Sequence, residues 1–223
     1  MCGRLILTLY PQDIREILPD VEVPEEWTPR YNIAPSQAIA VVANREPRRV
    51  DFFRWGLIPS WAKDSSIGHR MINARAESVA TKPSFRGPFK HRRCLVLANG
   101  FYEWQAAVGH GKKTPFCIQL KSHGPFALAG LWDVWRSPDG VAIPSCTIIT
   151  TTANQLMAPI HDRMPVILKP DAYGKWLDAG EPAPDRLVRF LEPYPADEMA
   201  AHPVSLLVNN PRHDVPECVV PVG

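Results

Sequence analysis

The sequence predicts an α+β fold with a twisted, largely antiparallel, barrel-like β-core and helices at its periphery. Runs of apolar, aromatic and β-branched residues follow one another with short turns between them, as sequential antiparallel strands do. Segments with a helical pattern are shorter. Proline makes up 24 of the 223 residues, roughly twice its usual share of ~5%, which favours irregular connections over a helical bundle.

Strands are expected where β-branched, aromatic and apolar residues concentrate. These segments are 92–104, 115–120, 126–135, 145–153 and 204–210. The glycine-containing segment 108–115 is expected to be the hairpin loop between the first two strands.

Helices are expected at four places with a helical spacing of apolar residues. These are 11–20, 152–160 with Thr152 as N-cap, 171–180 ending at Gly180, and 185–193. The proline-rich segment 180–185 is expected to be a surface loop and not a linker. Because no break in composition occurs, a single domain spanning 1–223 is predicted.

Composition narrows the class of protein. The five cysteines are odd in number and form no C-x-x-C pair, so neither a disulfide framework nor a structural zinc site is expected. We predict no metal and no cofactor. No signal peptide and no apolar run of about 18 residues is evident, so a cytoplasmic protein without membrane contact is expected. The net charge of +2 means that any nucleic-acid surface must be local.

The chain begins "MCGR", which places a small residue, Cys2, after the initiator methionine. Removal of Met1 is therefore expected. The new N-terminus would carry an amine and a thiol on adjacent carbons, so one residue offers two nucleophiles.

Two residues have the chemistry of proton transfer. On the strand 92–104, Glu103 shares a face with Leu95 and Phe101, and partial desolvation there raises the pKa of a carboxyl group. A bulge at Gly100 would move Glu103 to the other face of the strand. The pattern alone favours a glutamate at a strand end that is solvated or paired with a cation. His161 precedes Pro165 in a predicted loop, where a histidine can act near neutral pH or be merely structural.

Polar and aromatic residues elsewhere could contact an anionic ligand. Asn73, Arg75 and Glu77 lie on one face of a strand-like segment and could hold a carbonyl or a phosphate, or form a local ion pair. Trp55 and Trp61 could stack on unpaired bases, although tryptophans are more often core residues. A basic cluster at Lys90, Arg92 and Arg93 is a weak signal, because charge runs are usually solvated.

Nine segments, in order, resemble the SOS-response-associated peptidase (SRAP) family over nearly the whole chain. They are "MCGR", "RYNIAPSQ", "RWGLIPSWAKD", "INARAESV", "KPSFRGPFKHRRCLVLANGFYEW", "GLWDVW", "SCTIITTTAN", "IHDRMPVIL" and "VNNPRHDVPE". One departure is Asn99, where the family pattern has aspartate. This change would soften the electrostatics near Glu103.

The resemblance implies a single α+β domain with a basic channel for single-stranded DNA, and covalent capture of abasic sites. The Cys2 amine would form a Schiff base with the ring-opened sugar, and the thiol would close a thiazolidine. By the same match, Asn73 would position the reactants, Glu103 would shuttle the proton, and His161 would act as acid or base.

The resemblance also implies the DNA contacts. Arg4 and Arg75 are expected to bind phosphates, with Arg163 as a further contact, and Pro35 and Trp61 to act as wedge and stacking residues. The expected partner is single-stranded DNA with abasic sites. Replication-fork proteins are candidate partners, and a monomer is the default.

Two alternatives remain open. A cysteine peptidase or N-terminal-nucleophile amidase would use Cys2, His161 and Glu103 as thiol, base and orienting group, and would remove its own Met1. A non-catalytic reader of modified or single-stranded DNA would use Cys2 only as a small buried residue.

Overall fold

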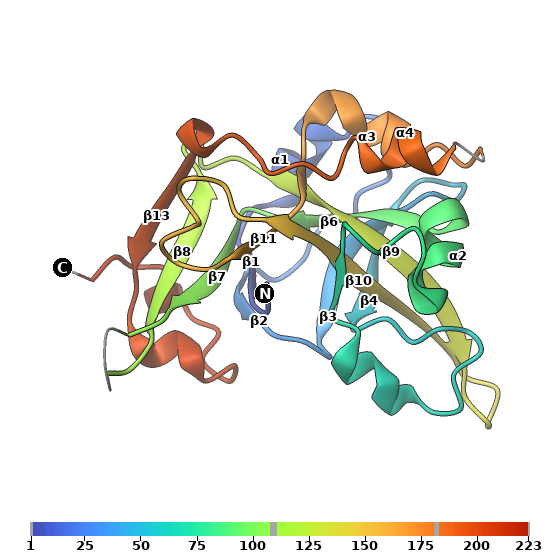
Figure 1. The fold of residues 1–223 in the computed structure, drawn as a ribbon, viewed down its shortest axis with the longest axis horizontal. Coiled ribbons are helices and arrows are strands. Elements are labelled where there is room, and N and C mark those ends of the chain that lie inside the picture. The colour runs from blue at the N-terminus through green and yellow to red at the C-terminus, as the bar shows by residue number, and fades with distance from the viewer. Residues whose placement is uncertain (1, 108–110, 181–182, 223) are drawn as a thin grey trace.

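The computed structural model describes residues 2–107, 111–180 and 183–222. One of its two sheets is fully antiparallel, and its strands follow the order β13-β8-β7-β1-β2. Their bounds are β13 Met199–Pro203, β8 Thr114–Leu120, β7 Gly100–Gln105, β1 Leu5–Leu7 and β2 Arg30–Ile33. Figure 1 shows this sheet on one side of the molecule, with the N-terminus near the middle.

The second sheet closes on itself. Strands β10, β4, β3, β6 and β9 pair in that order, and β9 pairs again with β10. The bounds of its members are β3 Ala38–Ala43, β4 Val50–Trp55, β5 Asn73–Arg75, β6 Arg93–Ala98, β9 Phe126–Arg136, β10 Ala142–Thr152, β11 Arg163–Pro165 and β12 Ile167–Leu168. β10 pairs in parallel with β4 and β5, and the other pairs are antiparallel. The predicted largely antiparallel, barrel-like α+β fold is confirmed.

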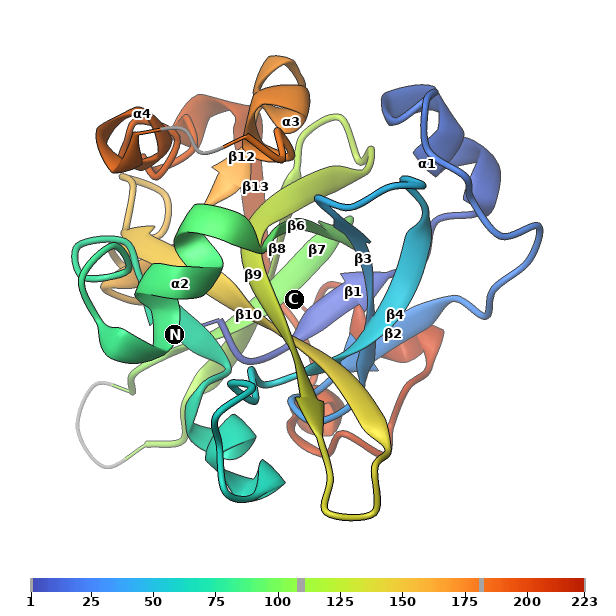
Figure 2. The ribbon, with the colours of Figure 1, turned by 90° about the vertical axis from the view of Figure 1, so that its right-hand side faces the viewer.

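Continuous apolar sequence explains the barrel wall. All six residues of β6 are buried, because one face lines the barrel and helices cover the other. Helices α2 (Pro83–His91) and α3 (Pro170–Trp176) pack on β6 and β9, and Figure 2 shows α2 beside β9. The β9–β10 hairpin extends beyond the barrel in the same view.

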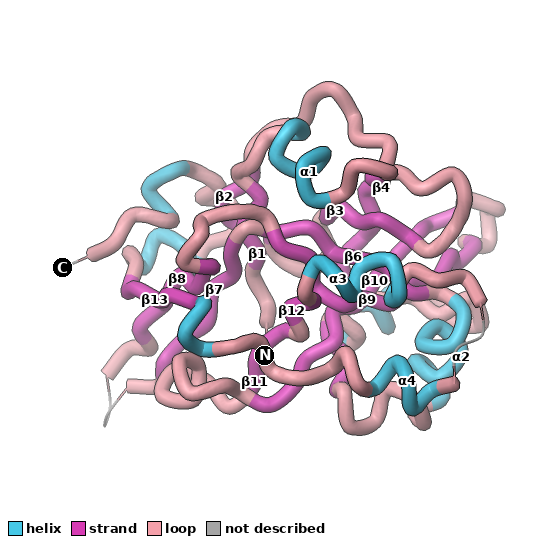
Figure 3. The backbone as a smooth tube through the Cα atoms, turned by 90° about the horizontal axis from the view of Figure 1, so that it is seen from above, coloured by secondary structure: helices cyan, strands magenta, loops and turns pink. Residues whose placement is uncertain are grey.

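The helices are short and peripheral, as Figure 3 shows in cyan. The remaining α-helices are α1 (Pro11–Ile17) and α4 (Pro184–Val188), and the 3₁₀ segments are η1 (Ser65–Arg70), η2 (Ala196–Glu198), η3 (Leu206–Asn209) and η4 (Pro216–Cys218). Helices α1 to α4 each have a proline in the first turn, where its missing N–H costs nothing. Part of the high proline content therefore starts helices. Within the described ranges no helix is long and apolar enough to span a bilayer.

Arg93 is fully buried and joins two helix ends. Its guanidinium donates to the carbonyl of Phe89 at 3.0 Å and to that of Trp176 at 2.9 Å, and it also bonds the carbonyls of Lys90 and Asp178. These acceptors lie at the C-terminal ends of α2 and α3, where a positive charge is favourable. The suggested basic cluster is therefore wrong for Arg93, which is internal, whereas Lys90 is exposed and Arg92 is half-buried.

Three predicted elements differ from the structure. The segment 152–160 forms turns instead of a helix, because the Asn154 carboxamide accepts the Met157 N–H at 2.9 Å and Pro159 follows. The segment 204–210 is not a strand: Ser205 caps the 3₁₀ segment η3, and β13 just upstream takes the place in the sheet.

The third element, 92–104, is broken at Asn99, and its two halves belong to different sheets. Gly100 allows this switch, since a Cβ there would lie 2.8 Å from the Ile6 side chain. The β7–β8 hairpin is confirmed by the pairing of Gln105 with Thr114, although residues 108–110 of its loop lie outside the described residues. Residues 181–182 of the expected 180–185 loop do so too.

Candidate functional site

The site begins at the chain start, where β1 pairs with β7. Leu5 lies opposite Phe101, and the Tyr102 N–H donates to the Arg4 carbonyl at 3.0 Å. Continuing this antiparallel register brings the residues before β1 alongside Glu103. Cys2 is fully buried and Glu103 is only 3% exposed.

Asn73 reaches this point from the barrel. It begins β5, which pairs in parallel with β10 through Ile148. Its side-chain amide donates to the main-chain carbonyl of Cys2 at 2.7 Å. Its carboxamide oxygen is buried and has no hydrogen-bond partner among the described residues. An acceptor is therefore available next to the chain start.

The electrostatics of Glu103 and Cys2 are coupled. Burial raises the pKa of the Glu103 carboxyl, while the charge of His161 acts in the opposite direction. Burial also raises the pKa of the Cys2 thiol far above its usual value, and the negative charge of Glu103 raises it further. Cys2, Glu103 and His161 therefore share one electrostatic environment.

His161 sits in the turn segment that follows β10. Gln105 of β7 anchors this segment by donating to the Pro159 carbonyl at 3.0 Å. The Arg163 N–H donates to His161 Nδ1 at 3.0 Å, while the exposed Asp162 carboxylate lies 2.8 Å from the same nitrogen. A backbone amide keeps its proton, so Nδ1 is the acceptor in the neutral ring and Nε2 carries the proton. The Asp162 carboxylate can accept a hydrogen bond from this nitrogen only when Nδ1 carries a proton.

The three predicted phosphate ligands differ in their surroundings. Arg75 is exposed on β5. Arg4 is partly buried, with Nη1 bonded to Asn32 Oδ1 at 2.7 Å and its guanidinium over the Trp104 ring. Arg163 forms a two-pronged ion pair with Glu77 and donates to the Thr150 carbonyl at 2.6 Å. Arg163 thus has fewer donors available for DNA than Arg75.

Pro35 lies in a tight turn. The Gln37 N–H donates to the Ala34 carbonyl at 3.2 Å, and Ser36 has a φ of 72°, in the left-handed region. The Ser36 N–H donates to the Trp55 carbonyl at 2.8 Å, which holds the turn against β4. Pro35 is half-buried at its corner.

The two tryptophans differ in their exposure to solvent. Trp55 is buried, and its indole N–H donates to the Ile72 carbonyl at 2.9 Å. Trp61 is 61% exposed and borders a hollow of about 300 Å³ that Lys63 and Arg70 also line. Trp55 is therefore a core residue, and Trp61 presents an aromatic surface beside two cations, Lys63 and Arg70, and one carboxylate, Asp64.

Comparison with known proteins places the chain in a family. The family described as SOS response associated peptidase (SRAP) matches residues 1–211. The chain belongs to the SRAP family. The resemblance read from the nine ordered segments is confirmed.

Relatives of this SRAP chain extend over its whole length. It is 48% identical over 222 residues to the abasic site processing protein YoqW of Bacillus subtilis, covering 98% of this chain and 99% of that protein. It is 34% identical to the mouse abasic site processing protein HMCES, covering 99% of this chain and 76% of that protein. A crystal structure of a protein from Bacteroides thetaiotaomicron matches with a TM-score of 0.88 at 25% identity, covering 99% of this chain and 100% of that chain.

The departure from the SRAP pattern at Asn99 lies away from Glu103. Asn99 sits at the opposite end of β7, where its side chain accepts from the Thr8 N–H at 2.9 Å and donates to the Thr8 hydroxyl at 2.9 Å. It joins the end of β6 to the chain after β1. The expected softening of the Glu103 electrostatics has no support in these contacts.

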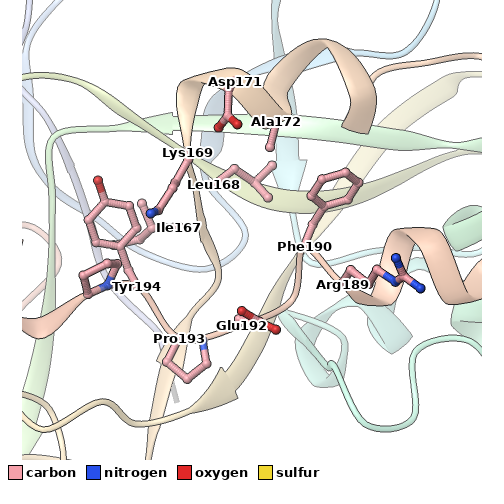
Figure 4. A pocket seen from close by; sticks show the side chains of 11 residues that line it. Ile167, Leu168, Lys169, Asp171, Ala172, Arg189, Phe190, Glu192, Pro193 and Tyr194 are labelled. Carbon is pink, nitrogen blue, oxygen red and sulfur yellow. The ribbon is translucent and has the colours of Figure 1, made fainter.

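A separate hollow of about 280 Å³ holds none of the predicted SRAP site residues (Figure 4). It lies between the start of α3 and the segment 189–195. Its charged lining residues are Lys169, Asp171, Arg189 and Glu192. Because two cations are matched by two carboxylates, this hollow lacks the charge excess of a phosphate site.

Sequence reasoning missed two groups that support the site. Asn32 on β2 contacts Arg4, and Gln105 holds the segment that carries His161. Neither side chain stands out by charge or periodicity, and their partners are distant in sequence. Among the described residues, no group of three or more His, Cys, Asp and Glu could hold a metal ion.

Proposed function

We propose that this SRAP protein captures abasic sites in single-stranded DNA by forming a thiazolidine crosslink at Cys2 after removal of Met1. The proposal treats residues 1–223 as one SRAP domain. The observation that carries it is the arrangement around Cys2: Asn73 bonds its carbonyl, and the carboxyl of Glu103 and the ring of His161 interact electrostatically beside it. The names of the relatives YoqW and HMCES support the same substrate.

The chemistry uses both nucleophiles of one residue. The neutral Cys2 amine adds to the aldehyde carbon of the ring-opened sugar, and loss of water gives an imine. The thiol then adds to that carbon, and its proton goes to the nitrogen, which completes a five-membered ring. An α-amine has a pKa of ~7.7–8.0, so a useful fraction is neutral near pH 7. Because the thiol is already tethered, effective molarity favours closure.

Glu103 and His161 carry the protons in this proposal. Burial raises the pKa of Glu103, so its carboxyl can donate a proton to the departing hydroxyl, and the resulting carboxylate can carry the thiol proton to the nitrogen during ring closure. His161, with its proton on Nε2 in the neutral ring, acts on the sugar hydroxyl. The unpartnered Asn73 oxygen accepts a hydrogen bond from the new α-amine and so orients the lone pair of the nitrogen.

The DNA strand is held by cations and aromatic surface. Arg4 and Arg75 contact phosphates on either side of the reacting sugar, and Arg163 mainly holds β11 against Glu77 while contributing to the positive field. Exposed Trp61 stacks on a base, and the Pro35 turn acts as a wedge.

The peptidase alternative has less support. A cysteine peptidase needs a thiolate, which requires a thiol pKa lowered by its surroundings. Here burial and then the Glu103 charge raise the pKa of Cys2. Thiazolidine closure uses a neutral thiol that gives up its proton during addition, so it tolerates this environment.

A denaturing gel tests the proposal. Protein that mass spectrometry shows to lack Met1 is mixed with a single-stranded oligonucleotide carrying one abasic site, beside Cys2→Ala and Cys2→Ser. A heat-resistant, slowly migrating band only with Cys2 is expected, with near-normal non-covalent binding by both variants. Absence of that band would reject capture, and a burst of acyl-enzyme with peptide substrates would then favour the peptidase.

A further inference from the structure

Arg4 is held by neutral groups. Its Nη1 donates to Asn32 Oδ1 at 2.7 Å and to the Val208 carbonyl at 2.6 Å, and its guanidinium carbon lies 5.6 Å from the centre of the Trp104 ring. Its Nε is buried without a hydrogen-bond partner in the described part of the chain. No carboxylate of the described residues forms an ion pair with it. The positive charge of Arg4 is therefore oriented but not neutralised.

Asn32 is the centre of this arrangement. It is fully buried on β2, and its amide nitrogen faces the carbonyls of Val208, Asn210 and His213 at 3.2, 3.2 and 2.7 Å. Three carbonyls around the nitrogen fix the orientation of the carboxamide, so its oxygen must face Arg4. If an aspartate replaced Asn32, one of its carboxylate oxygens would face these three carbonyl oxygens, and no hydrogen would be available between them.

The loop 208–213 is in turn locked to β2. The Asp214 carboxylate accepts the N–H groups of Tyr31 and Asn32 at 2.5 and 2.9 Å and pairs with Arg30. Asn209 accepts the Trp104 indole N–H at 2.7 Å, which fixes the ring under Arg4. The last of the nine family-like segments thus contacts the first directly, through the Val208 carbonyl and Arg4, and indirectly through Asn32 and Trp104.

We propose that Asn32, together with the loop 208–213, is a positioning device that aims the Arg4 guanidinium at a DNA phosphate beside Cys2. This inference rests on the proposed function, because it assumes that Arg4 contacts DNA. Asn32 acts only through Arg4, and Asn209 supports the same geometry through Trp104. The C-terminal segment thereby contributes to DNA affinity without touching DNA.

A double-mutant cycle tests this relationship. Affinity for an undamaged single-stranded oligonucleotide is measured by fluorescence anisotropy for wild type, Asn32→Ala, Arg4→Ala and the double variant. Asn32→Ala is expected to weaken binding about fivefold in the wild-type background and by less than about twofold when Arg4 is absent. Arg4→Ala should reduce the slope of log affinity against log salt by ~0.7, as loss of one phosphate contact does. Equal factors in both backgrounds, or no effect in wild type, would overturn the inference.

Two further variants show whether a loss of DNA affinity in Asn32→Ala comes from misfolding. Asn209→Ala changes an exposed residue, so it should fold normally and show the same dependence on Arg4 if Asn32→Ala does not fold. Asn44→Ala is the matched control, because Asn44 is a buried amide that accepts from the Arg93 N–H at 2.9 Å and the Trp132 indole at 3.0 Å, outside the site. It should lower thermal stability without changing DNA affinity.

Crosslinking separates this inference from the proposed function. Asn32→Ala should raise the protein concentration that gives half-maximal crosslinking and leave the maximal rate within about twofold of wild type. A wild-type protein that forms no Cys2-dependent crosslink contradicts the proposed function. If wild type crosslinks normally but the effects of Asn32→Ala and Arg4→Ala on DNA affinity are additive, only the positioning role is contradicted.

Discussion

The side-chain amide of Asn73 donates a 2.7 Å hydrogen bond to the main-chain carbonyl of Cys2. This bond connects β5, at the edge of the closed sheet, to the residue that precedes β1 of the other sheet. The chain start is thus fixed from both sides, by Asn73 and by the pairing of β1 with β7. In the proposed reaction the nucleophile lies at the chain terminus and needs such restraint, since termini are otherwise poorly ordered.

Asn73→Asp keeps the shape of the side chain but removes the donor and adds a carboxylate near Glu103. Loss of the bond leaves the buried Cys2 carbonyl unsatisfied, which destabilises the positioned conformation of Cys2 by about 2 kcal/mol. Because the reaction needs that conformation, its rate should fall by about 30-fold. We expect single-turnover crosslinking to slow by that factor, while affinity for undamaged single-stranded DNA changes less than about twofold. A crosslinking rate equal to that of wild type would remove Asn73 from the reaction.

Glu103→Gln should slow crosslinking and change the pH dependence of stability. Burial raises the pKa of Glu103 in the folded protein, so its ionisation costs stability as pH rises above the unfolded value of about 4.3. Glutamine has no such cost. The melting temperature of Glu103→Gln relative to wild type should therefore rise between pH 4 and pH 8, while the crosslinking rate at pH 7 falls.

The opposite slope for the melting temperature would mean that the carboxylate is stabilised by its surroundings. A crosslinking rate at the wild-type level would mean that another group moves the proton. Measuring both properties on one variant separates a group strained for function from a group that merely supports the fold.

Local pattern predicted much of the barrel but little of the site. The strands β8, β9 and β10 follow from their apolar runs, and α1 and α3 from the helical spacing of apolar residues. The sheet switch at Asn99 did not follow, because its cause is the close approach of Ile6 to Gly100, which is 94 positions away along the chain. Glu103 is buried, whereas the pattern alone favoured a solvated or ion-paired strand end, and its strand β7 pairs with β1 in the other sheet instead of continuing β6.

No local sequence pattern indicates that the side chains around Cys2 come together. Asn73, Glu103 and His161 come from β5, β7 and the segment after β10, and only the resemblance to the SRAP family grouped them beforehand. Their roles stay predictions. Arg93 shows the reverse problem: within a run of basic residues it reads as surface charge, and only the ends of α2 and α3 explain its burial.

Arg93→Met should destabilise the protein strongly. Removing the guanidinium leaves several buried carbonyls of α2 and α3 without donors, at a cost of about 3 kcal/mol or more. Arg86→Met is the matched control, since Arg86 on α2 is exposed and forms no ion pair with the described residues, so its loss should cost about 0.5 kcal/mol or less. Urea unfolding measures both. Equal free energies of unfolding for the two variants would contradict the internal capping role of Arg93.

Trp61→Ala should weaken single-stranded DNA binding without lowering stability. The ring is 61% exposed, so its removal loses little packing, whereas stacking on a base is worth about 1–3 kcal/mol, or about 5- to 150-fold in affinity. Phe52→Ala is the matched control, because Phe52 is 47% exposed and contacts Trp27 in a hollow that contains no predicted site residue. If both variants bind an undamaged oligonucleotide like wild type, the aromatic surface beside Lys63 and Arg70 does not contact DNA. A loss confined to Trp61→Ala would place the strand over the exposed ring of Trp61, beside Lys63 and Arg70.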